Sequence, residues 1–413
     1  MSRILKTPIT LSRRSFGISA LSVAAAGLSG CAGGSGVGGA TGSTPLAAEA
    51  PPVMPENGAT GAIGTGQFKV GMILPLSAAG NAGFAAQSMK NAAELAITEF
   101  NSTDIQLLVK DDAGNAGTAR AMAEQAMDEG CQIILGPLFA PAVRAVGQTA
   151  RQRGVPVIAF STDASIASRG IYLLSFLPES DVQRVLDYSF SAGKRSYAGL
   201  VPDNAYGSVV EATFREEVAK RGGRIVAMER YPSDKAKLAE SVKIVAQSAR
   251  SADAIFVPDG ADTVPFVVTA LQSGGVDTKR IQLLGSGLWD DPRIFNAAAL
   301  HGGLYAAPDT SGFVSFSQRY RNRYGQEPAR TATLAYDAAA LIAALVRTQG
   351  PQRPTDEMLT NPSGFAGIDG VFRFKPDGTN DRGLAVLRVA SGGGQLVSAA
   401  PKSFNPAGAS AAL

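Results

Sequence analysis

The sequence predicts an α/β protein made of two similar lobes, each with a doubly wound sheet. The first observation is the stretch from Cys131 to Ser168, where two short apolar runs at 132–135 and 155–160 flank a helical segment. Runs of large or β-branched apolar residues are typical of parallel strands that are buried on both faces. The second observation is that strand-like and helix-like segments alternate along the chain, and that this alternation begins again after Pro178. The two halves therefore form a weak internal repeat.

In the first half, glycine and proline mark the ends of the expected elements. Gly136-Pro137 ends one strand and Gly154 closes the helix that follows it. We expect strands at 68–76, 105–110, 132–135, 155–160 and 172–176, and helices at 82–101, at 118–129 and between Pro141 and Gly154. Ligands of such sheets bind beyond the carboxyl ends of the strands, so loops 136–141 and 161–168 should line one wall of a cleft.

The second half repeats the pattern. Gly222-Gly223 separates a helix from the next strand, and Pro202 ends a strand just before Asp203 and Asn204. We expect helices at 181–192, 209–221, 238–249 and 263–272, strands at 197–201, 224–229, 254–257 and 281–284, then helices at 314–324 and 331–347 and a strand pair at 370–374 and 384–389. Residues 393–413 are mostly small or polar, and we expect a disordered tail.

Residues 1–30 have the composition of an export leader. Arg13 and Arg14 precede an apolar, alanine-rich stretch that is too short to span a membrane as a mature helix, and residues 28–31 read LSGC. The arginine pair resembles a twin-arginine export signal, and LSGC resembles a bacterial lipobox. The resemblance implies cleavage before Cys31 and lipidation of that cysteine, with the outer membrane favoured because alanine, not aspartate, follows it. The alternative is a cleaved secretory leader followed by an accidental cysteine.

Residues 31–66 have the composition of a linker. They are mainly Gly, Ala, Ser, Thr and Pro, with almost no large apolar side chain. Such a segment cannot bury enough surface to fold. We therefore expect a flexible tether between the lipid anchor and the folded lobes.

The composition argues against nucleic-acid binding, metal binding and catalysis. Four of the 38 basic residues lie in the leader, so the remaining 34 face 35 acidic residues, and nothing favours a polyanionic partner. His301 is the single histidine, while Cys31 and Cys131 are the two cysteines, which removes disulfide frameworks and zinc-cluster spacings. Neither a G-x-S-x-G nor a G-x-x-x-x-G-K-[ST] motif occurs. We expect no enzyme activity, no cofactor and no metal; an envelope hydrolase is the least favoured alternative.

Three motifs carry a resemblance to a known family. Residues 70–77 read VGMILPLS, residues 201–207 read VPDNAYG, and residues 335–338 read AYDA. From about Phe68 to Val389 the chain resembles the type I periplasmic binding proteins of the leucine-binding group. The resemblance implies two lobes joined by a hinge that the chain crosses three times, with the ligand between the lobes. It assigns residues 67–177 and 303–350 to lobe 1, and residues 178–302 and 351–392 to lobe 2.

A narrower resemblance rests on FSTDAS at 160–165, LGSGLWDDP at 284–292 and FRFKPDG at 372–378. These stretches look like those of the lipoproteins called penicillin-binding protein activators, which use this fold to recognise a partner and are not enzymes. The favoured hypothesis is a lipid-anchored, periplasm-facing regulator of cell-wall synthesis whose partner is a penicillin-binding protein. The alternative is a solute-binding receptor of an ABC transporter for an amino acid or related small molecule, whose partner is the transporter permease.

Residues that follow the predicted strands are the candidates to contact a small molecule or peptide in the cleft. In the first half they are Ser77, Leu138, Phe139, Ser161, Thr162 and Asp163, and in the facing half Asp203, Asn204, Tyr206, Asp259, Trp289 and Asp290. Receptors of free amino acids hold the ligand carboxylate with hydroxyl and N–H groups. Leu138 and Phe139 offer no hydroxyl at the first such position, and Asp163 would repel a carboxylate, although Ser161 and Thr162 can donate.

This predicted rim is acidic and aromatic, which suits an amine, a sugar or a peptide better than an anion. Each residue also has an ordinary structural interpretation. Asp203 and Asn204 are typical helix-capping residues. Tyr206 can simply pack in the core, and Trp289 can act as a wedge at the hinge.

Overall fold

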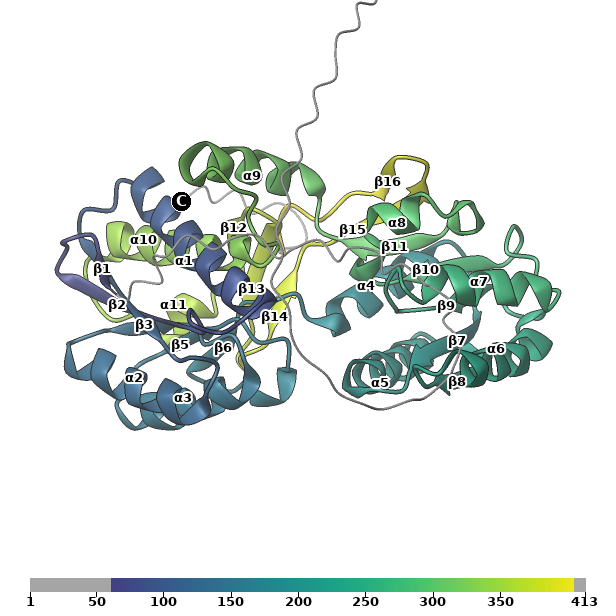
Figure 1. The fold of residues 1–413 in the computed structure, drawn as a ribbon, viewed down its shortest axis with the longest axis horizontal. Coiled ribbons are helices and arrows are strands. Elements are labelled where there is room, and N and C mark those ends of the chain that lie inside the picture. Colours follow the sequence, from purple (N-terminus) through teal and green to yellow (C-terminus); the bar gives the residue numbers. More distant parts are fainter. Residues whose placement is uncertain (1–60, 405–413) are drawn as a thin grey trace, which may run out of the picture. The chain divides into compact units, whose positions relative to one another are not determined.

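The first lobe is built on a six-stranded sheet whose central strands are apolar on both faces. The structure, a computed structural model, describes residues 61–404 of the chain (Figure 1). In sequence order the strands are β1 (Gly61–Ile63), β2 (Phe68–Leu74), β3 (Ile105–Asp111), β4 (Ile133–Leu135), β5 (Val157–Ala159) and β6 (Ile171–Leu173). Their spatial order is β1-β3-β2-β4-β5-β6, in which β2 to β6 run parallel and β1 joins β3 in the antiparallel sense.

Helices cover both faces of this sheet, which explains the unbroken apolar runs in its strands (Figure 1). The helices of lobe 1 are α1 (Asn81–Glu99), α2 (Ala116–Asp128), α3 (Ala140–Gln152), α9 (Thr310–Tyr324) and α10 (Ala332–Gln349). In β4, Ile133 and Leu135 pack in the core formed with α1 and α10, while Ile134 packs in the core formed with α2 and α3. Alternation along one strand therefore supplies both hydrophobic layers.

The second lobe repeats this construction around a seven-stranded sheet. Its elements are α4 (Pro178–Ser191), β7 (Ser196–Pro202), α5 (Ala205–Lys220), β8 (Arg224–Tyr231), α6 (Lys235–Ala249), β9 (Ala254–Phe256), α7 (Val264–Ser273), β10 (Gln282–Gly285), α8 (Pro292–Phe295), β11 (Leu304–Ala307), β15 (Ala385–Ala390) and β16 (Gly393–Ser398). The strand order is β16-β15-β11-β10-β9-β7-β8. Strands β7 to β11 are parallel, and β15 and β16 extend the sheet in the antiparallel sense. The predicted fold class of two doubly wound lobes is confirmed.

A small third sheet completes lobe 1. It consists of β12 (Phe365–Gly367), β13 (Gly370–Phe374) and β14 (Asn380–Arg382), and it follows the short helix α11 (Asp356–Leu359). Phe372 and Phe374 are buried in the core of lobe 1, and the ring centroid of Phe374 lies 5.4 Å from that of Tyr172. The N–H of Leu173 donates to the carbonyl of Gly378 at 2.8 Å, which ties the small sheet to β6.

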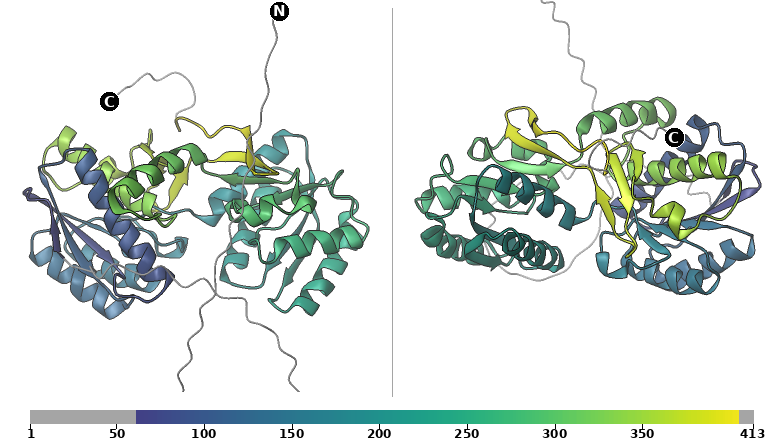
Figure 2. Two further views of the ribbon diagram at one scale, coloured as in Figure 1. Left: turned by 45° about the horizontal axis from the view of Figure 1, so that its top comes forward. Right: turned by 180° about the vertical axis from the view of Figure 1, so that it is seen from behind.

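The chain passes between the lobes at three places: between β6 and α4, between β11 and α9, and between β14 and β15. Both lobes belong to one compact unit of the chain. The C-terminal strands divide between the lobes, with β13 and β14 beside lobe 1 and β15 and β16 in the sheet of lobe 2 (Figure 2). Three crossings are what the family resemblance implied.

Two of the predicted lobe boundaries are corrected. The second crossing follows β11, not residue 302, because Leu304 pairs with both Leu284 of β10 and Arg388 of β15. Residues 351–382 belong with lobe 1 and not with lobe 2, because Leu359, Phe372 and Phe374 are buried in its core. A lobe boundary that is predicted from a change in sequence pattern carries no information about which sheet a nearby short strand joins.

The predicted ends of the folded region are also corrected. Strand β1 lies inside the range expected to be tether, where Gly61 pairs with Val109 at the edge of the first sheet. Strand β16 lies inside the range expected to be a disordered tail, where Leu396 pairs with Leu387. An edge strand pairs with a single neighbouring strand through backbone hydrogen bonds. A glycine-rich edge strand can therefore form without a clear pattern of hydrophobic residues. Within residues 61–404, no helix is long and apolar enough to cross a bilayer.

Candidate functional site

A cavity of about 390 Å³ lies where the first two crossings meet both lobes. Its lining residues are Thr162, Phe176, Pro178, Asp181, Tyr206, Gly287, Leu288, Asp290, Ala307, Pro308 and Arg330. Thr162 and Arg330 come from lobe 1, Phe176 and Pro308 from the crossings, and the others from lobe 2, among them Pro178 at the start of α4. The volume lies within the range of roughly 300–1,000 Å³ that is typical of small-molecule sites. A ligand held here would contact both lobes and the segments that join them.

The walls of this cavity are largely apolar. Phe176 and Pro308 lie on the crossing segments and Pro178 begins α4, and the ring of each proline restricts its own backbone φ angle. Leu288 belongs to a short 3-10 turn after β10, and 48% of its side chain remains exposed. A large apolar side chain that is left exposed beside a cavity becomes buried when a ligand fills that cavity, which favours binding.

Asp181 supplies the first acidic group. It lies in the first turn of α4, where its Oδ2 accepts a hydrogen bond of 2.9 Å from the backbone N–H of Gly287. A Cβ at Gly287 would stand 3.0 Å from that oxygen, so the close approach favours glycine. Burial raises the pKa of the Asp181 carboxyl to about 7, and the neighbouring charge of Glu179 adds to the effect.

Asp290 supplies the second acidic group. Its Oδ1 accepts a hydrogen bond of 3.0 Å from the hydroxyl of Tyr305, a buried residue of β11. Burial raises the pKa of this carboxyl, although the hydrogen bond from Tyr305 works in the opposite direction. Tyr206 lies nearby on α5, and its hydroxyl donates to Oγ of Ser286 at 2.9 Å.

Arg330 supplies the basic group, but its charge is already paired. Its two terminal nitrogens donate to the two carboxylate oxygens of Asp369, at 2.6 and 3.0 Å. The guanidinium also lies 4.7 Å from the ring centre of Phe176 and 4.5 Å from that of Phe313. A bidentate carboxylate pair that is stacked between two rings holds this side chain in one orientation.

A second arginine lies on the hinge behind the cavity. The guanidinium of Arg382 is buried and lies 4.7 Å from the ring centre of Phe176, and its Nε donates to the carbonyl of Ser175 at 3.1 Å. Among the described residues its two terminal nitrogens have no hydrogen-bond partner. Asp337 is buried near it and accepts from the N–H of Ile368 at 2.8 Å. Burial raises the pKa of Asp337 to about 7, against the opposing charge of Arg382.

Three of the twelve predicted contact residues line the cavity: Thr162, Tyr206 and Asp290. Three others, Asp203, Asn204 and Asp259, line a separate cavity of about 200 Å³ within lobe 2. There Asn204 caps helix α5 by accepting from the N–H of Gly207 at 2.8 Å, as its ordinary interpretation predicted.

Trp289 does not line the cavity, which corrects the sequence-based prediction. Its side chain is 0% exposed and lies in the core of lobe 2, where its indole N–H donates to the carbonyl of Val257 at 3.0 Å. The indole fits because two glycines flank it: a Cβ would stand 2.1 Å from the ring at Gly285 and 2.7 Å from it at Gly303. The side chain of Trp289, which follows strand β10, therefore packs in the core of lobe 2 and does not point toward the cavity.

The other five predicted residues follow strands of lobe 1 but lie outside both of these cavities. The N–H of Ser77 donates to Asp111, and Oγ of Ser161 accepts from the N–H of Asp163. Asp163 in turn caps a short 3-10 turn. Leu138 packs on the core of lobe 1, and Phe139 precedes helix α3 with 38% of its side chain exposed.

Asp181, Phe176, Leu288 and Arg330 line the cavity but were missed by the sequence analysis. The restart of the pattern at Leu177-Pro178 marked the first crossing, and residues beside a crossing must lie near the hinge. That reasoning would have found Phe176 and Asp181. Arg330 had no such signal, because its partner Asp369 is 39 residues away.

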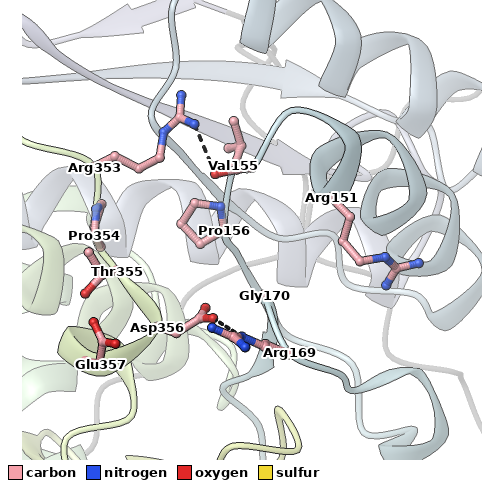
Figure 3. Close-up of a pocket in the computed structure, with 11 residues that line it drawn as sticks. Arg151, Val155, Pro156, Arg169, Gly170, Arg353, Pro354, Thr355, Asp356 and Glu357 are labelled. Carbon is pink, nitrogen blue, oxygen red and sulfur yellow. Dashed lines mark hydrogen bonds and ion pairs between the residues drawn. The ribbon is translucent and has the colours of Figure 1, made fainter.

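A larger cavity, of about 570 Å³, lies within lobe 1 at the amino ends of β5 and β6 (Figure 3). Three of its charged side chains, Arg169, Asp356 and Arg353, are bound by other groups of the protein. Arg169 pairs with Asp356, and Arg353 donates to the carbonyl of Gly154 at 3.0 Å (Figure 3). Asp356 also accepts from the hydroxyl of Tyr172 at 2.5 Å. These bonds fix the segment before α11 onto lobe 1. The cavity between the lobes is therefore the better candidate site.

Two further observations concern reactive groups. Within the part of the chain that the structure describes, no group of three His, Cys, Asp or Glu side chains is arranged to hold a metal ion. Cys131 is buried, and burial raises the pKa of its thiol to about 11. A thiol that holds its proton this firmly is a core residue and not a nucleophile.

Two doubly wound lobes, three crossings and a cavity at the hinge define a ligand-binding protein of the two-lobed type. The chain belongs to the periplasmic binding protein family, whose sequence pattern matches residues 67–394, and it is of the leucine-binding type. The family and the fold are those of binding proteins and not of enzymes, and membership implies an extracytoplasmic location.

Similar solved structures come from ABC transporters. A protein of Rhodospirillum rubrum, described as a branched-chain amino acid ABC transporter, has a TM-score of 0.71 and 22% sequence identity, over 80% of this chain and 99% of that one. A solute binding protein of Rhodopseudomonas palustris BisB5, in complex with 3,4-dihydroxybenzoic acid, has a TM-score of 0.58 and 23% identity, over 82% and 97% of the two chains. At such identities the likeness establishes the fold alone.

A different relative was found by sequence. The penicillin-binding protein activator LpoA of Yersinia pseudotuberculosis is 26% identical over 131 residues. The matched region is 32% of this chain and 20% of the relative. The chain therefore corresponds to a small part of that protein.

Proposed function

We propose that the protein is a non-enzymatic receptor of the cell envelope whose inter-lobe cavity binds a small molecule. The observation that carries this proposal is the cavity itself, which has apolar walls, a few fixed polar groups and contributions from both lobes. The buried, proton-holding thiol of Cys131 fits a protein without a cysteine nucleophile.

The position of the cavity at the hinge supports a mechanism based on lobe closure. A ligand that contacts Thr162 of lobe 1 and Asp181 of lobe 2 at once binds the closed arrangement more tightly than an open one. That difference in affinity shifts the population toward closure, because a ligand moves an equilibrium only by its differential affinity for the two states. The closed form is then what a partner protein recognises.

The location is part of the proposal. We propose that Arg13 and Arg14 direct export through the twin-arginine route and that Cys31 carries a lipid anchor, most favourably in the outer membrane. These residues lie outside the described part of the chain, so the support comes from the leader sequence and from the extracytoplasmic family. Several acyl chains on one residue give near-permanent attachment, at about 0.8 kcal/mol per buried CH₂.

A second candidate function is regulation of cell-wall synthesis through contact with a penicillin-binding protein. The observation that favours it is the 131-residue similarity to the activator of Yersinia pseudotuberculosis, although 80% of that relative lies outside the match. The two functions are compatible, since a ligand in the cavity can control which partner the lobes bind. The alternative partner is the permease of an ABC transporter, for a receptor that delivers its ligand.

Two measurements on the full-length protein test these functions. The first is a screen of amino acids, aromatic acids, amines, sugars and peptidoglycan fragments, with the melting temperature and the radius of gyration as readouts. A ligand at one hundred times its dissociation constant should add about 2.7 kcal/mol of stability, and it should also compact the protein. If no compound changes either readout, the receptor function is wrong.

The second measurement is a pull-down with purified penicillin-binding proteins and transporter permeases, which decides between the two kinds of partner.

A further inference from the structure

Several hydrogen-bond donors at the inter-lobe cavity are already used by carboxylates of the protein, although the hydroxyl of Thr162, which also lines the cavity, is not among them. The backbone N–H of Gly287 donates to the carboxylate of Asp181 at 2.9 Å and is therefore not free to bind a carboxylate of a ligand. The two terminal nitrogens of Arg330 are bound by Asp369, and the hydroxyl of Tyr305 by Asp290. An anionic ligand would have to displace one of these pairs.

The acceptors are the groups that remain available. Asp181 uses one carboxylate oxygen on Gly287, and Asp290 uses one on Tyr305. Their second oxygens have no hydrogen-bond partner among residues 61–404, and neither oxygen is among the fully buried, unpartnered atoms, so both are open to the cavity or to solvent. One carboxylate oxygen of Glu179, two residues before Asp181, is buried without a partner. The polar side of the cavity therefore has an excess of acceptors.

The charge balance points the same way. Arg330 is the one basic residue among those that line the cavity, and the fully buried carboxylate of Asp369 offsets its charge. Asp181 and Asp290 then have no salt bridge among residues 61–404, although the charge of Arg330 also acts on Asp290. A ligand carboxylate placed beside them would be repelled and would also lose hydration. A protonated amine would supply both a positive charge and N–H donors.

The apolar walls specify the rest of the ligand. Phe176, Pro178, Pro308 and the half-exposed Leu288 offer contact to hydrocarbon or to an aromatic ring, and they offer no hydrogen bond from their side chains. The ring of Tyr206 adds an aromatic surface close to Asp181. We propose that the cavity binds a protonated amine with a compact apolar or aromatic body and without a carboxylate. This inference rests on the receptor function proposed above and names the ligand class for the same cavity.

The inference sets this chain apart from structural relatives whose ligands are acids. One of them holds 3,4-dihydroxybenzoic acid, another 4-hydroxybenzoate and a third isoleucine. A carboxyl group is common to all three ligands, whereas here the carboxylate that binds the N–H of Gly287 belongs to the protein itself. The ligand class therefore differs although the fold is shared.

A matched set of probes tests the ligand class directly. The full-length protein is titrated calorimetrically, at mildly alkaline pH, with 2-phenylethylamine, 3-phenylpropanoate, 2-phenylethanol and phenylalanine. All four carry the same phenyl ring and differ in the polar group. The amine should bind in a saturable way, and the acid, the alcohol and the amino acid should bind at least about tenfold more weakly, because a charge-assisted hydrogen bond to a carboxylate contributes that much.

Variants assign the binding to the two carboxyl groups. Asp181→Asn and Asp290→Asn keep the size of the side chain and should each weaken amine binding by about tenfold or more. Asp187→Asn is the matched control, since Asp187 lies on the same helix as Asp181, its side chain is 64% exposed and it is not among the cavity residues. It should bind the amine as the unchanged protein does. Melting curves of all three variants show whether each one is folded.

Every other result overturns the inference. Tighter binding of 3-phenylpropanoate or 2-phenylethanol would reject the ligand class while leaving the receptor function intact. The same holds if all four probes fail but a compound of the wider screen that is not an amine causes closure. Undiminished amine binding by folded Asp181→Asn and Asp290→Asn would move the site elsewhere. Failure of every probe and of every compound in the screen would overturn the receptor function together with the inference.

Discussion

Arg330 and Asp369 form two hydrogen bonds, of 2.6 and 3.0 Å, between the start of α10 and the turn that joins β12 to β13. The carboxylate is fully buried, while 40% of the arginine side chain remains exposed at the cavity. This pair therefore links the small third sheet to the segment before α10, where Arg330 also lies 4.7 Å from the ring centre of Phe176 on the first crossing.

Asp369→Asn should lower the free energy of unfolding by about 2 kcal/mol. Removing one partner of a fully buried ion pair costs about 3–5 kcal/mol, and the partial exposure of Arg330 reduces that loss. Urea unfolding measures it. The exposed pair Arg153–Asp128 provides the control, since Asp128→Asn should change stability by no more than about 1 kcal/mol. Equal effects of the two substitutions would mean that the Arg330 pair does not support the hinge.

Gly285→Ala should destabilise lobe 2 by about 2 kcal/mol or more, because the added methyl group would stand 2.1 Å from the indole of Trp289. The single tryptophan reports this change, since its emission should shift to longer wavelength if the indole is pushed out of the core. Gly260→Ala is the matched control, where a Cβ meets no atom within 4 Å. An unchanged emission maximum and melting temperature for Gly285→Ala would contradict the packing described here.

Stability should fall as the pH rises from about 4 to about 7. Burial raises the folded-state pKa of Asp337 to about 7 from an ordinary value of 3.8, so the folded protein keeps a proton that the unfolded chain has lost. A folded state that binds more protons loses stability with rising pH, by up to about 1.4 kcal/mol per pH unit for one group. Asp181 contributes in the same direction because burial also raises its pKa to about 7.

Asp337→Asn should flatten this dependence, since the amide does not titrate and its oxygen can still accept from the N–H of Ile368. Urea unfolding of the variant and of the unchanged protein, at several pH values across this range, gives the two slopes. Asp187→Asn should leave the slope as it is, because this side chain is largely exposed. Parallel slopes for Asp337→Asn and the unchanged protein would mean that Asp337 releases its proton at an ordinary pH.

Replacing Arg13 and Arg14 together by lysine should stop export through the twin-arginine route, because that route is expected to read the paired guanidinium groups. Cell fractionation with protease treatment measures the exported pool. Cys31→Ala should abolish attachment of a fatty-acid analogue and leave the protein soluble or unprocessed. Normal export of the double-lysine protein would reject the route, and label retained by Cys31→Ala would reject the lipid anchor.

Most helices and central strands could be predicted from the sequence because their signals are local. The apolar run of β4 and the cap at Asn204 each depend on neighbouring residues, and both are present as expected. The edge strands β1 and β16 were missed because their glycine-containing sequences carry little hydrophobic pattern, whereas the edge strands β6 and β8 were predicted. Strand β11 was also missed, although it is apolar and buried, because the expected boundary at residue 302 separated it from the sheet that it joins.

The candidate site was predicted less well, for a physical reason. A residue that follows a strand can point into the cleft, as Asp290 does, or turn back into the sheet, as Trp289 does. The choice depends on space made by distant residues, here Gly303 opposite the indole. Such space is a property of packing and not of the local pattern.

The sequence by itself determined the α/β class, the two-lobed repeat and the family, because periodic apolar runs and short motifs are read directly along the chain. Only the tertiary structure decided that Asp181 would cap the N–H of Gly287 and that Asp369 would pair with Arg330, since each pair joins segments far apart in the chain. These two pairings decide which polar groups remain free to bind a ligand. Both pairings form only when the lobes are folded.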